Sequence, residues 1–104
     1  LLLTPTQAAP PPRIGELASD ADNPMAPFIA SSPYGLYTLP FNLSGQPAIS
    51  LPGGLTVGDD RWPAGLPLGV QLVAPQGGER LLLSVARQWE EASPWSGHVP
   101  AVFG

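Results

Sequence analysis

Two neighbouring stretches decide the fold: YTLPFNLSGQPAISLPGG at residues 37–54 and GLPLGVQLV at residues 65–73. Each contains a short apolar run, at residues 48–51 and 68–73, bounded by Pro and Gly in the way that is typical of a β-strand. A polar connection lies between the runs, and its Asp59 and Asp60 are most simply turn residues. The pattern predicts a hairpin, with the Pro52-Gly53-Gly54 sequence ending its first strand.

Both strands of this hairpin have two apolar or small faces. Ile49 and Leu51 share one face of the first strand, and residues 68, 70 and 72 share one face of the second. Strands of this kind are covered on both sides in a layered structure. We therefore expect an α/β fold with a parallel or mixed sheet.

Residues 79–90 form the clearest helix of the sequence. Apolar residues recur there at spacings of three and four and make one stripe: Leu81, Leu82, Val85, Ala86 and Trp89. Two glycines precede this helix, and Pro94 prevents its continuation. We expect it to pack on one face of the sheet and to be followed by an irregular tail over residues 91–104.

The N-terminal third is predicted to be a strand followed by a long connection. Residues 1–4 are apolar and suit a strand whose hydrogen-bonding neighbours lie elsewhere. Seven prolines between residues 5 and 33 argue against any long helix and favour extended or turn geometry. Residues 10–12 are read as a stiff proline spacer, with a polyproline ligand for a partner domain as the alternative. The acidic residues of this connection, Glu16, Asp20 and Asp22, are read as solvating it.

Residues 34–73 are predicted to hold a core turn followed by the hairpin, and the turn is expected to be helical. Thr38 can cap it, and Pro40 then takes an early position where its missing N–H has no cost. We expect Phe41 and Leu43 of this turn to point toward the core.

Composition excludes several classes of function. The net charge is −4, with four Arg and no Lys, so a basic footprint for nucleic acid or an anionic membrane is missing. The sequence contains no Cys, no pair of His residues and no phosphate-binding loop, so it indicates no metal or cofactor site. Charged residues make up 12% of the chain, against about 25% in free-standing domains. We expect a cytoplasmic component whose surface largely faces protein, and a homo-oligomer is left open.

No catalytic residue can be assigned from these patterns. A triad of Ser44, His98 and Asp59 or Asp60 would lack the Gly-x-Ser-x-Gly turn that exposes such a serine. The absence of Lys removes every mechanism that needs an amine as base.

Four stretches in series resemble the C-terminal portion of amidase signature enzymes. They are LLLTPT at residues 1–6, YTLPFNLSGQPAISLP at residues 37–52, GLPLGVQLV at residues 65–73, and the Leu-rich helix that ends in Trp89-Glu90. The resemblance implies a mixed β-sheet sandwiched between helices and an amide hydrolase with a Ser-cisSer-Lys triad. In that family the triad lies upstream of the matching region, so no catalytic residue is carried over to this chain.

The resemblance also implies a wall of the substrate pocket at residues 35–45, with Gly35, Tyr37, Thr38 and Asn42 as its candidate residues. Asn42 is expected to hold this loop by side-chain hydrogen bonds to the backbone, with substrate contact as the alternative. Relatives that act on glutamine for tRNA amidation carry an Asp three residues before the Thr, where this chain has Gly35. That difference favours amides with less polar acyl groups, although Gly35 also suits a turn.

Two hypotheses follow for the whole chain, residues 1–104. The first is the C-terminal fragment of an amidase domain, folded against an upstream fragment or chain that carries the triad and shapes the site for a small-molecule amide. The second is a non-catalytic structural or interaction module derived from an amidase. In both, we expect the isolated polypeptide to be loosely folded, because a hairpin, one helix and an unpaired strand bury little surface.

Overall fold

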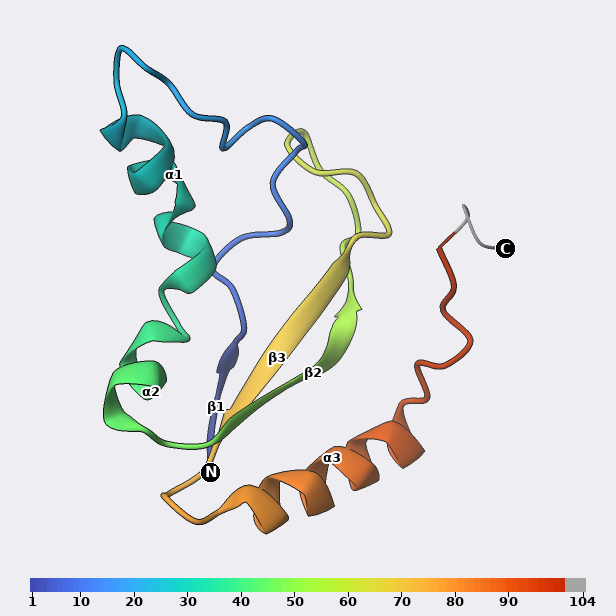
Figure 1. Ribbon diagram of the computed structural model, residues 1–104. Helices are drawn as coiled ribbons and strands as arrows, with labels where there is room; N and C mark the ends of the chain where they lie inside the picture. Colours follow the sequence, from blue (N-terminus) through green and yellow to red (C-terminus); the bar gives the residue numbers. More distant parts are fainter. Residues whose placement is uncertain (101–104) are drawn as a thin grey trace.

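The computed structural model describes residues 1–100 and shows a small sheet between helices (Figure 1). Its elements in chain order are β1 (Leu2–Pro5), α1 (Met25–Gly35), α2 (Leu39–Ser44), β2 (Ala48–Leu55), β3 (Pro67–Val73) and α3 (Glu79–Ala92). Helices α1 and α2 lie along one side of the sheet and α3 along the other. The combination of strands and helices is compatible with the predicted α/β class.

The sheet has the order β1-β3-β2, and both pairings are antiparallel. The predicted hairpin is confirmed, since β2 and β3 pair along their whole lengths. Two expectations need correction. Strand β1 finds its partner within this chain, with Leu2 opposite Val73 and Pro5 opposite Val70. Among the strands of residues 1–100 no parallel pair occurs, because β1 and β2 both run against the central strand β3.

Strand β2 continues through the sequence that was expected to end it. Its pairing with β3 extends to Leu55, with an irregular register between Pro52 and Gly54. An edge strand tolerates Pro because one side of its backbone needs no partner, and a bulge absorbs the extra residue. Gly54 has a φ of 134°, which a residue with a side chain rarely adopts.

The core lies between the sheet and α3. Leu82 and Ala86 of α3 are buried against Leu51 of β2 and Leu72 of β3. Trp89 packs at its margin and donates a hydrogen bond from Nε1 to the Pro52 carbonyl (2.8 Å). The helix is confirmed and ends two residues later than expected, at Ala92. Most of the predicted stripe faces the core; Leu81, 47% exposed, does not.

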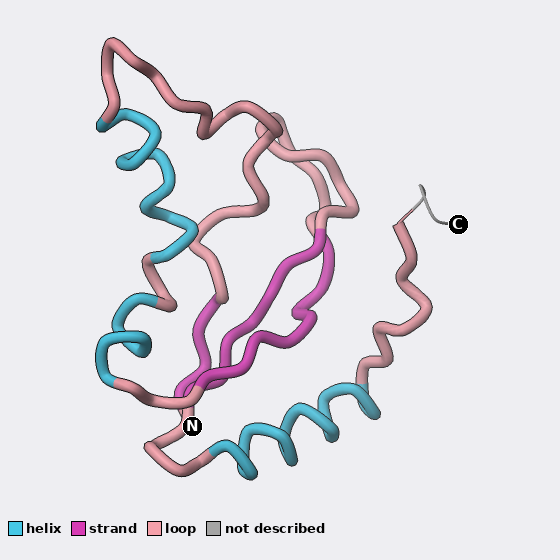
Figure 2. The backbone as a smooth tube through the Cα atoms, in the orientation of Figure 1, coloured by secondary structure: helices cyan, strands magenta, loops and turns pink. Residues whose placement is uncertain are grey.

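The long connection is partly helical, contrary to the prediction. Residues 6–24 are irregular (Figure 2), but α1 begins at Met25 despite the nearby prolines. Pro27 lies in its first turn, where the N–H of any residue has no helical partner, and Pro33 lies close to its end. Helix α1 buries no residue.

None of the described helices is long and apolar enough to cross a membrane. The predicted tail follows α3 over residues 93–100 without a further helix or strand, and its last four residues, 101–104, lie outside the part that the structure describes.

Candidate functional site

The four residues predicted for the pocket wall lie in one continuous segment between the end of α1 and the middle of α2. Gly35 ends α1, Tyr37 and Thr38 form the connection, and Asn42 lies within α2. A Cβ at Gly35 would meet nothing within 4 Å, and its φ is not positive, so neither space nor backbone conformation requires glycine there. Gly35 therefore ends α1 and also begins the turn over residues 36–38, since its carbonyl accepts the Thr38 N–H (3.3 Å), in line with the alternative role given to it.

Helix α2 is a short turn closed by glycine. Thr38 is its N-cap residue, as predicted, but its hydroxyl donates back to the Gly35 carbonyl (3.3 Å) and caps no α2 amide. Pro40 lies in the first turn, and Gly45 ends the helix in the left-handed conformation, with a φ of 71°. Phe41 is half-buried, whereas Leu43 is 80% exposed, so the prediction that Leu43 points to the core is wrong. The physical reason is that α2 buries none of its residues.

Asn42 does not carry the structural role expected of it. Its side chain is exposed. The hydrogen bonds that fix the segment to the sheet come from glutamines: Gln46 donates to the Ala74 carbonyl (3.3 Å), Gln76 to the Ser44 carbonyl (3.2 Å) and Gln71 to the Tyr37 carbonyl (2.9 Å). Sequence reasoning missed these residues. The available signal was Gln71, a long amide inside an otherwise apolar strand.

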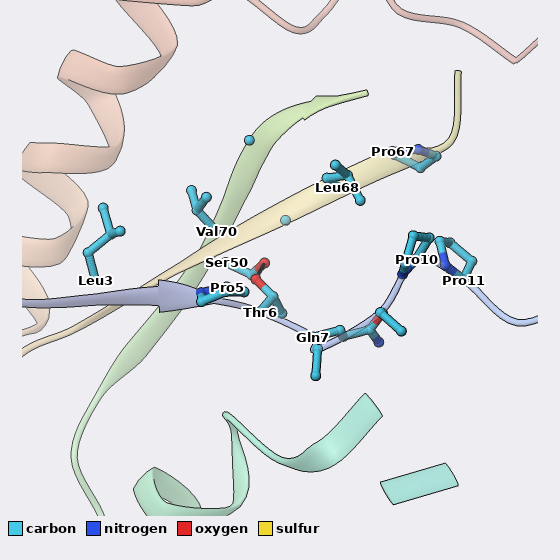
Figure 3. A pocket seen from close by; sticks show the side chains of 14 residues that line it. Leu3, Pro5, Thr6, Gln7, Pro10, Pro11, Ser50, Pro67, Leu68 and Val70 are labelled. Carbon is cyan, nitrogen blue, oxygen red and sulfur yellow. Dashed lines mark hydrogen bonds between the residues drawn. The ribbon is translucent and has the colours of Figure 1, made fainter. Parts of the chain in front are cut away.

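A hollow lies away from the wall, between the Pro-rich connection and β3 (Figure 3). It has a volume of about 660 Å³ and is lined mainly by residues 5–11 of the connection and 67–70 of β3. The Thr6 and Ser50 hydroxyls meet there at 2.7 Å, next to Gly69. None of the four wall residues lines this hollow. The structure therefore keeps the predicted wall and the hollow apart.

No side chain that lines the hollow is an acid or a base. An amide hydrolase needs a nucleophile and a proton acceptor within hydrogen-bond reach of each other. The Thr6 and Ser50 hydroxyls alone supply no proton acceptor of suitable basicity, so the hollow cannot carry out hydrolysis with the groups that line it.

The residues of the rejected triad are each engaged locally. The Ser44 hydroxyl donates to Gln46 Oε1 (3.1 Å), and His98 stacks on Trp95 with 4.4 Å between ring centroids. The backbone N–H groups of Trp62 and Arg61, each 2.8 Å from Asp59 Oδ1, lower the pKa of that carboxyl below its ordinary value. Asp59 is a turn residue, as predicted. Residues 1–100 contain no group of three His, Asp or Glu residues placed to hold a metal ion.

Comparison with known proteins supports the resemblance noted in the sequence. Residues 1–83 match the Amidase family model. The chain is 46% identical to the 6-aminohexanoate-cyclic-dimer hydrolase of Paenarthrobacter ureafaciens over 99% of its length and 21% of the relative's. It is 45% identical to the enzyme of the same name from Pseudomonas sp. strain NK87, with the same coverage.

A third relative has a different name. It is a glutamyl-tRNA(Gln) amidotransferase subunit from Pseudomonas aeruginosa strain LESB58, 37% identical over 99% of this chain and 18% of its own length. The chain thus spans about a fifth of the length of the curated relatives that it matches. No solved structure gives a significant match. The family match covers most of the chain, and the chain belongs to the amidase family.

Proposed function

We propose that this chain is the C-terminal part of an amidase that hydrolyses a carboxylic amide to an acid and an amine. In this proposal the chain contributes scaffold and one wall of the substrate pocket, residues 35–45. The Ser-cisSer-Lys triad comes from an upstream segment or from another chain.

The observation that carries the proposal is the coverage of the relatives. They match 99% of this chain, but the chain matches only about a fifth of a relative. The sequence contains no Lys that could act as the base of the triad. A family member of this length therefore needs reactive groups from outside these 104 residues.

The surface of the molecule supports the same proposal. Its Cα radius of gyration is 16.2 Å, whereas a compact domain of this length has about 13 Å. Large apolar side chains are exposed on β1 and α1, among them Leu3 (58%), Phe28 (69%) and Ile29 (64%). The outer edges of β1 and β2 pair with no strand in residues 1–100. Contact with further amidase polypeptide would cover these side chains and edges.

The substrate that we propose is an amide with a weakly polar acyl group. Gly35 stands where glutamine-specific relatives were expected to carry an Asp, and an exposed glycine offers no charge to bind a polar acyl group. The identity to the two cyclic-dimer hydrolases, 46% and 45%, also exceeds the 37% identity to the amidotransferase relative.

A chimaera tests the proposal. Residues 1–104 replace the matching 108-residue alignment region of the Paenarthrobacter ureafaciens hydrolase, and hydrolysis of a series of simple amides is measured. We expect the chimaera to release amine, and we expect neither the chain alone nor the hydrolase without its matching region to do so.

The outcomes separate the two hypotheses. Activity of the chimaera alone supports the enzymatic role. A chimaera that is folded by circular dichroism but hydrolyses no amide would contradict it and would favour a non-catalytic module. Faster hydrolysis of glutamine than of apolar acyl amides would contradict the proposed substrate class.

A further inference from the structure

The candidate pocket wall is attached to the sheet by side-chain amides. Helix α2 buries no residue, so apolar packing contributes little to its position. Three glutamines instead donate to carbonyl groups. Gln76, in the turn after β3, donates to Ser44 at the end of the wall, and Gln46, directly after the wall, donates to Ala74 of that turn. Gln71 joins the start of the wall to the centre of the sheet.

Gln71 differs from the other two in burial and in geometry. Its exposed fraction is 4%, and it is the one buried polar residue of the described chain. Its Nε2 group has two protons and meets two acceptors: Thr4 Oγ1 of β1 at 3.0 Å and the Tyr37 carbonyl at 2.9 Å. One side chain of the central strand thus links the edge strand β1 to the wall.

The strand register determines the face of the sheet to which the Gln71 side chain points. Gln71 pairs with Thr4 on one side and with Ser50 on the other, whereas Leu72, next along the chain, packs in the core under α3. Successive side chains of a strand point to opposite faces. Gln71 therefore lies on the face away from α3, which is the side of the sheet along which α1 and α2 run (Figure 1).

We infer that Gln71 is a positioning residue for the substrate-pocket wall. It holds the backbone of Tyr37 and, through it, Thr38 and the start of α2, without touching the substrate itself. This inference rests on the proposed function, because only in an amidase does the wall meet a substrate. Loss of the Gln71 Nε2 donor leaves the Tyr37 carbonyl without its hydrogen-bond partner. The start of the wall then moves, because α2 buries no residue that would hold it by apolar packing.

Two variants separate the two hydrogen bonds of Gln71. Gln71→Met keeps the length of the side chain and removes both protons. Thr4→Val removes the acceptor on β1, together with the bond that the Thr4 hydroxyl donates to the Pro5 carbonyl (2.9 Å), and leaves the bond to Tyr37 intact. If Gln71 merely stabilised the sheet, both variants would have the same effect. If it positions the wall, only the first affects substrate binding.

The experiment measures both variants in the active chimaera. For Gln71→Met we expect KM to rise about five- to tenfold, the effect of one lost hydrogen bond, with kcat changed less than about twofold. For Thr4→Val we expect both constants within about twofold of the parent, with a lower melting temperature. Gln71→Leu, which also lacks the donating nitrogen and adds no charge at this buried position, replaces Gln71→Met if the latter does not fold. An unchanged KM in the folded Gln71 variant, or equal changes in both variants, would overturn the inference.

A second measurement does not depend on activity. The amides of Phe41 and Asn42 donate to the Thr38 carbonyl at 3.2 and 3.1 Å, so their hydrogen exchange reports unwinding of the first turn of α2, which directly follows Tyr37 in the wall. We expect faster exchange in Gln71→Met and the parental rate in Thr4→Val. A chimaera without amidase activity that shows this difference would overturn the proposed function and support the positioning role. Parental exchange in Gln71→Met would overturn the positioning role in an active chimaera.

Discussion

Replacement of Gly69 by Ala should weaken the attachment of the Pro-rich connection to the sheet. Gly69 lies in β3 below the point where Thr6 and Ser50 join their hydroxyls at 2.7 Å. A Cβ at this position would lie 2.8 Å from Thr6 Oγ1, 3.0 Å from Ser50 Oγ and 3.1 Å from Thr6 Cβ. Both hydroxyls must move to admit the methyl group, and their hydrogen bond is lost.

The magnitude follows from three contributions. The lost hydrogen bond costs about 1 kcal/mol. Forcing a methyl group into contact costs about 1–3 kcal/mol, with the lower value apt here because the hydroxyl pair is solvent-exposed and can move. Removal of a glycine from a strand returns about 0.5–1 kcal/mol. We expect a net local destabilisation of about 1–2 kcal/mol.

Hydrogen exchange of the Thr6 amide is the assay. This amide donates to the Gly69 carbonyl at 3.1 Å, so it exchanges when the connection leaves β3. In the chimaera, a loss of about 1–2 kcal/mol corresponds to exchange about 5- to 30-fold faster. Thr6→Ala is the matched control, because it loses the hydroxyl pair without adding a methyl group. If Gly69→Ala exchanges at the parental rate, or if the effects of the two substitutions simply add, the steric reasoning is wrong, since both act on the same hydroxyl pair.

Three further predictions concern stability. Leu82→Ala should destabilise the chimaera by about 2–5 kcal/mol, because Leu82 is 3% exposed in the core. Its neighbour Leu83 is 63% exposed, so Leu83→Ala should change the free energy of unfolding by no more than about 0.5 kcal/mol. Urea unfolding followed by tryptophan fluorescence compares the two variants. The isolated chain should bind the dye ANS and melt without a sharp transition, and a cooperative melt with dispersed amide resonances would contradict this. Because folding lowers the pKa of Asp59 below its ordinary 3.8, the stabilisation from its carboxylate is present above that value and is lost as the pH falls through the lower folded pKa. Exchange of the Arg61 and Trp62 amides should therefore rise at acid pH relative to a neutral reference amide, and Asp59→Asn should abolish this dependence.

The parts of the fold that the sequence predicted are those in which local pattern and burial agree. The apolar runs bounded by Pro and Gly at residues 48–51 and 68–73 predicted the hairpin, and the stripe of Leu82, Val85 and Ala86 predicted α3. Proline was the source of two errors, the missed helix α1 and the early end assigned to β2. Pro27 in the first turn of α1 and Pro52 in the edge strand β2 occupy positions that need no N–H donor, and sequence alone does not reveal such positions. Pro33 lies inside α1, two residues before its end, where it costs one helical hydrogen bond.

The candidate site was less predictable because its contacts are long-range. The partner of β1 lies 65 or more residues away in sequence, and no periodic pattern reports such a pairing. The hydrogen bond from Gln71 to Tyr37 spans 34 residues and involves a backbone carbonyl, which has no sequence signature. The wall residues Gly35, Tyr37, Thr38 and Asn42 came from family resemblance, and their contact with substrate remains a prediction.

The two faces of the sheet are stabilised by different forces, and this difference bears on function. On the α3 side, buried residues such as Leu51, Leu72 and Leu82 each contribute about 1.5–3 kcal/mol by leaving water. On the other side, α2 buries no residue, and each glutamine hydrogen bond contributes a net of about 0.5–1.5 kcal/mol, roughly half as much. Segments held by few apolar contacts open at lower free energy than the core. In the amidase that we propose, the wall is therefore the side of this chain that adjusts to a substrate while the core remains fixed. On our inference Gln71, which is buried and joined to Tyr37, limits that movement.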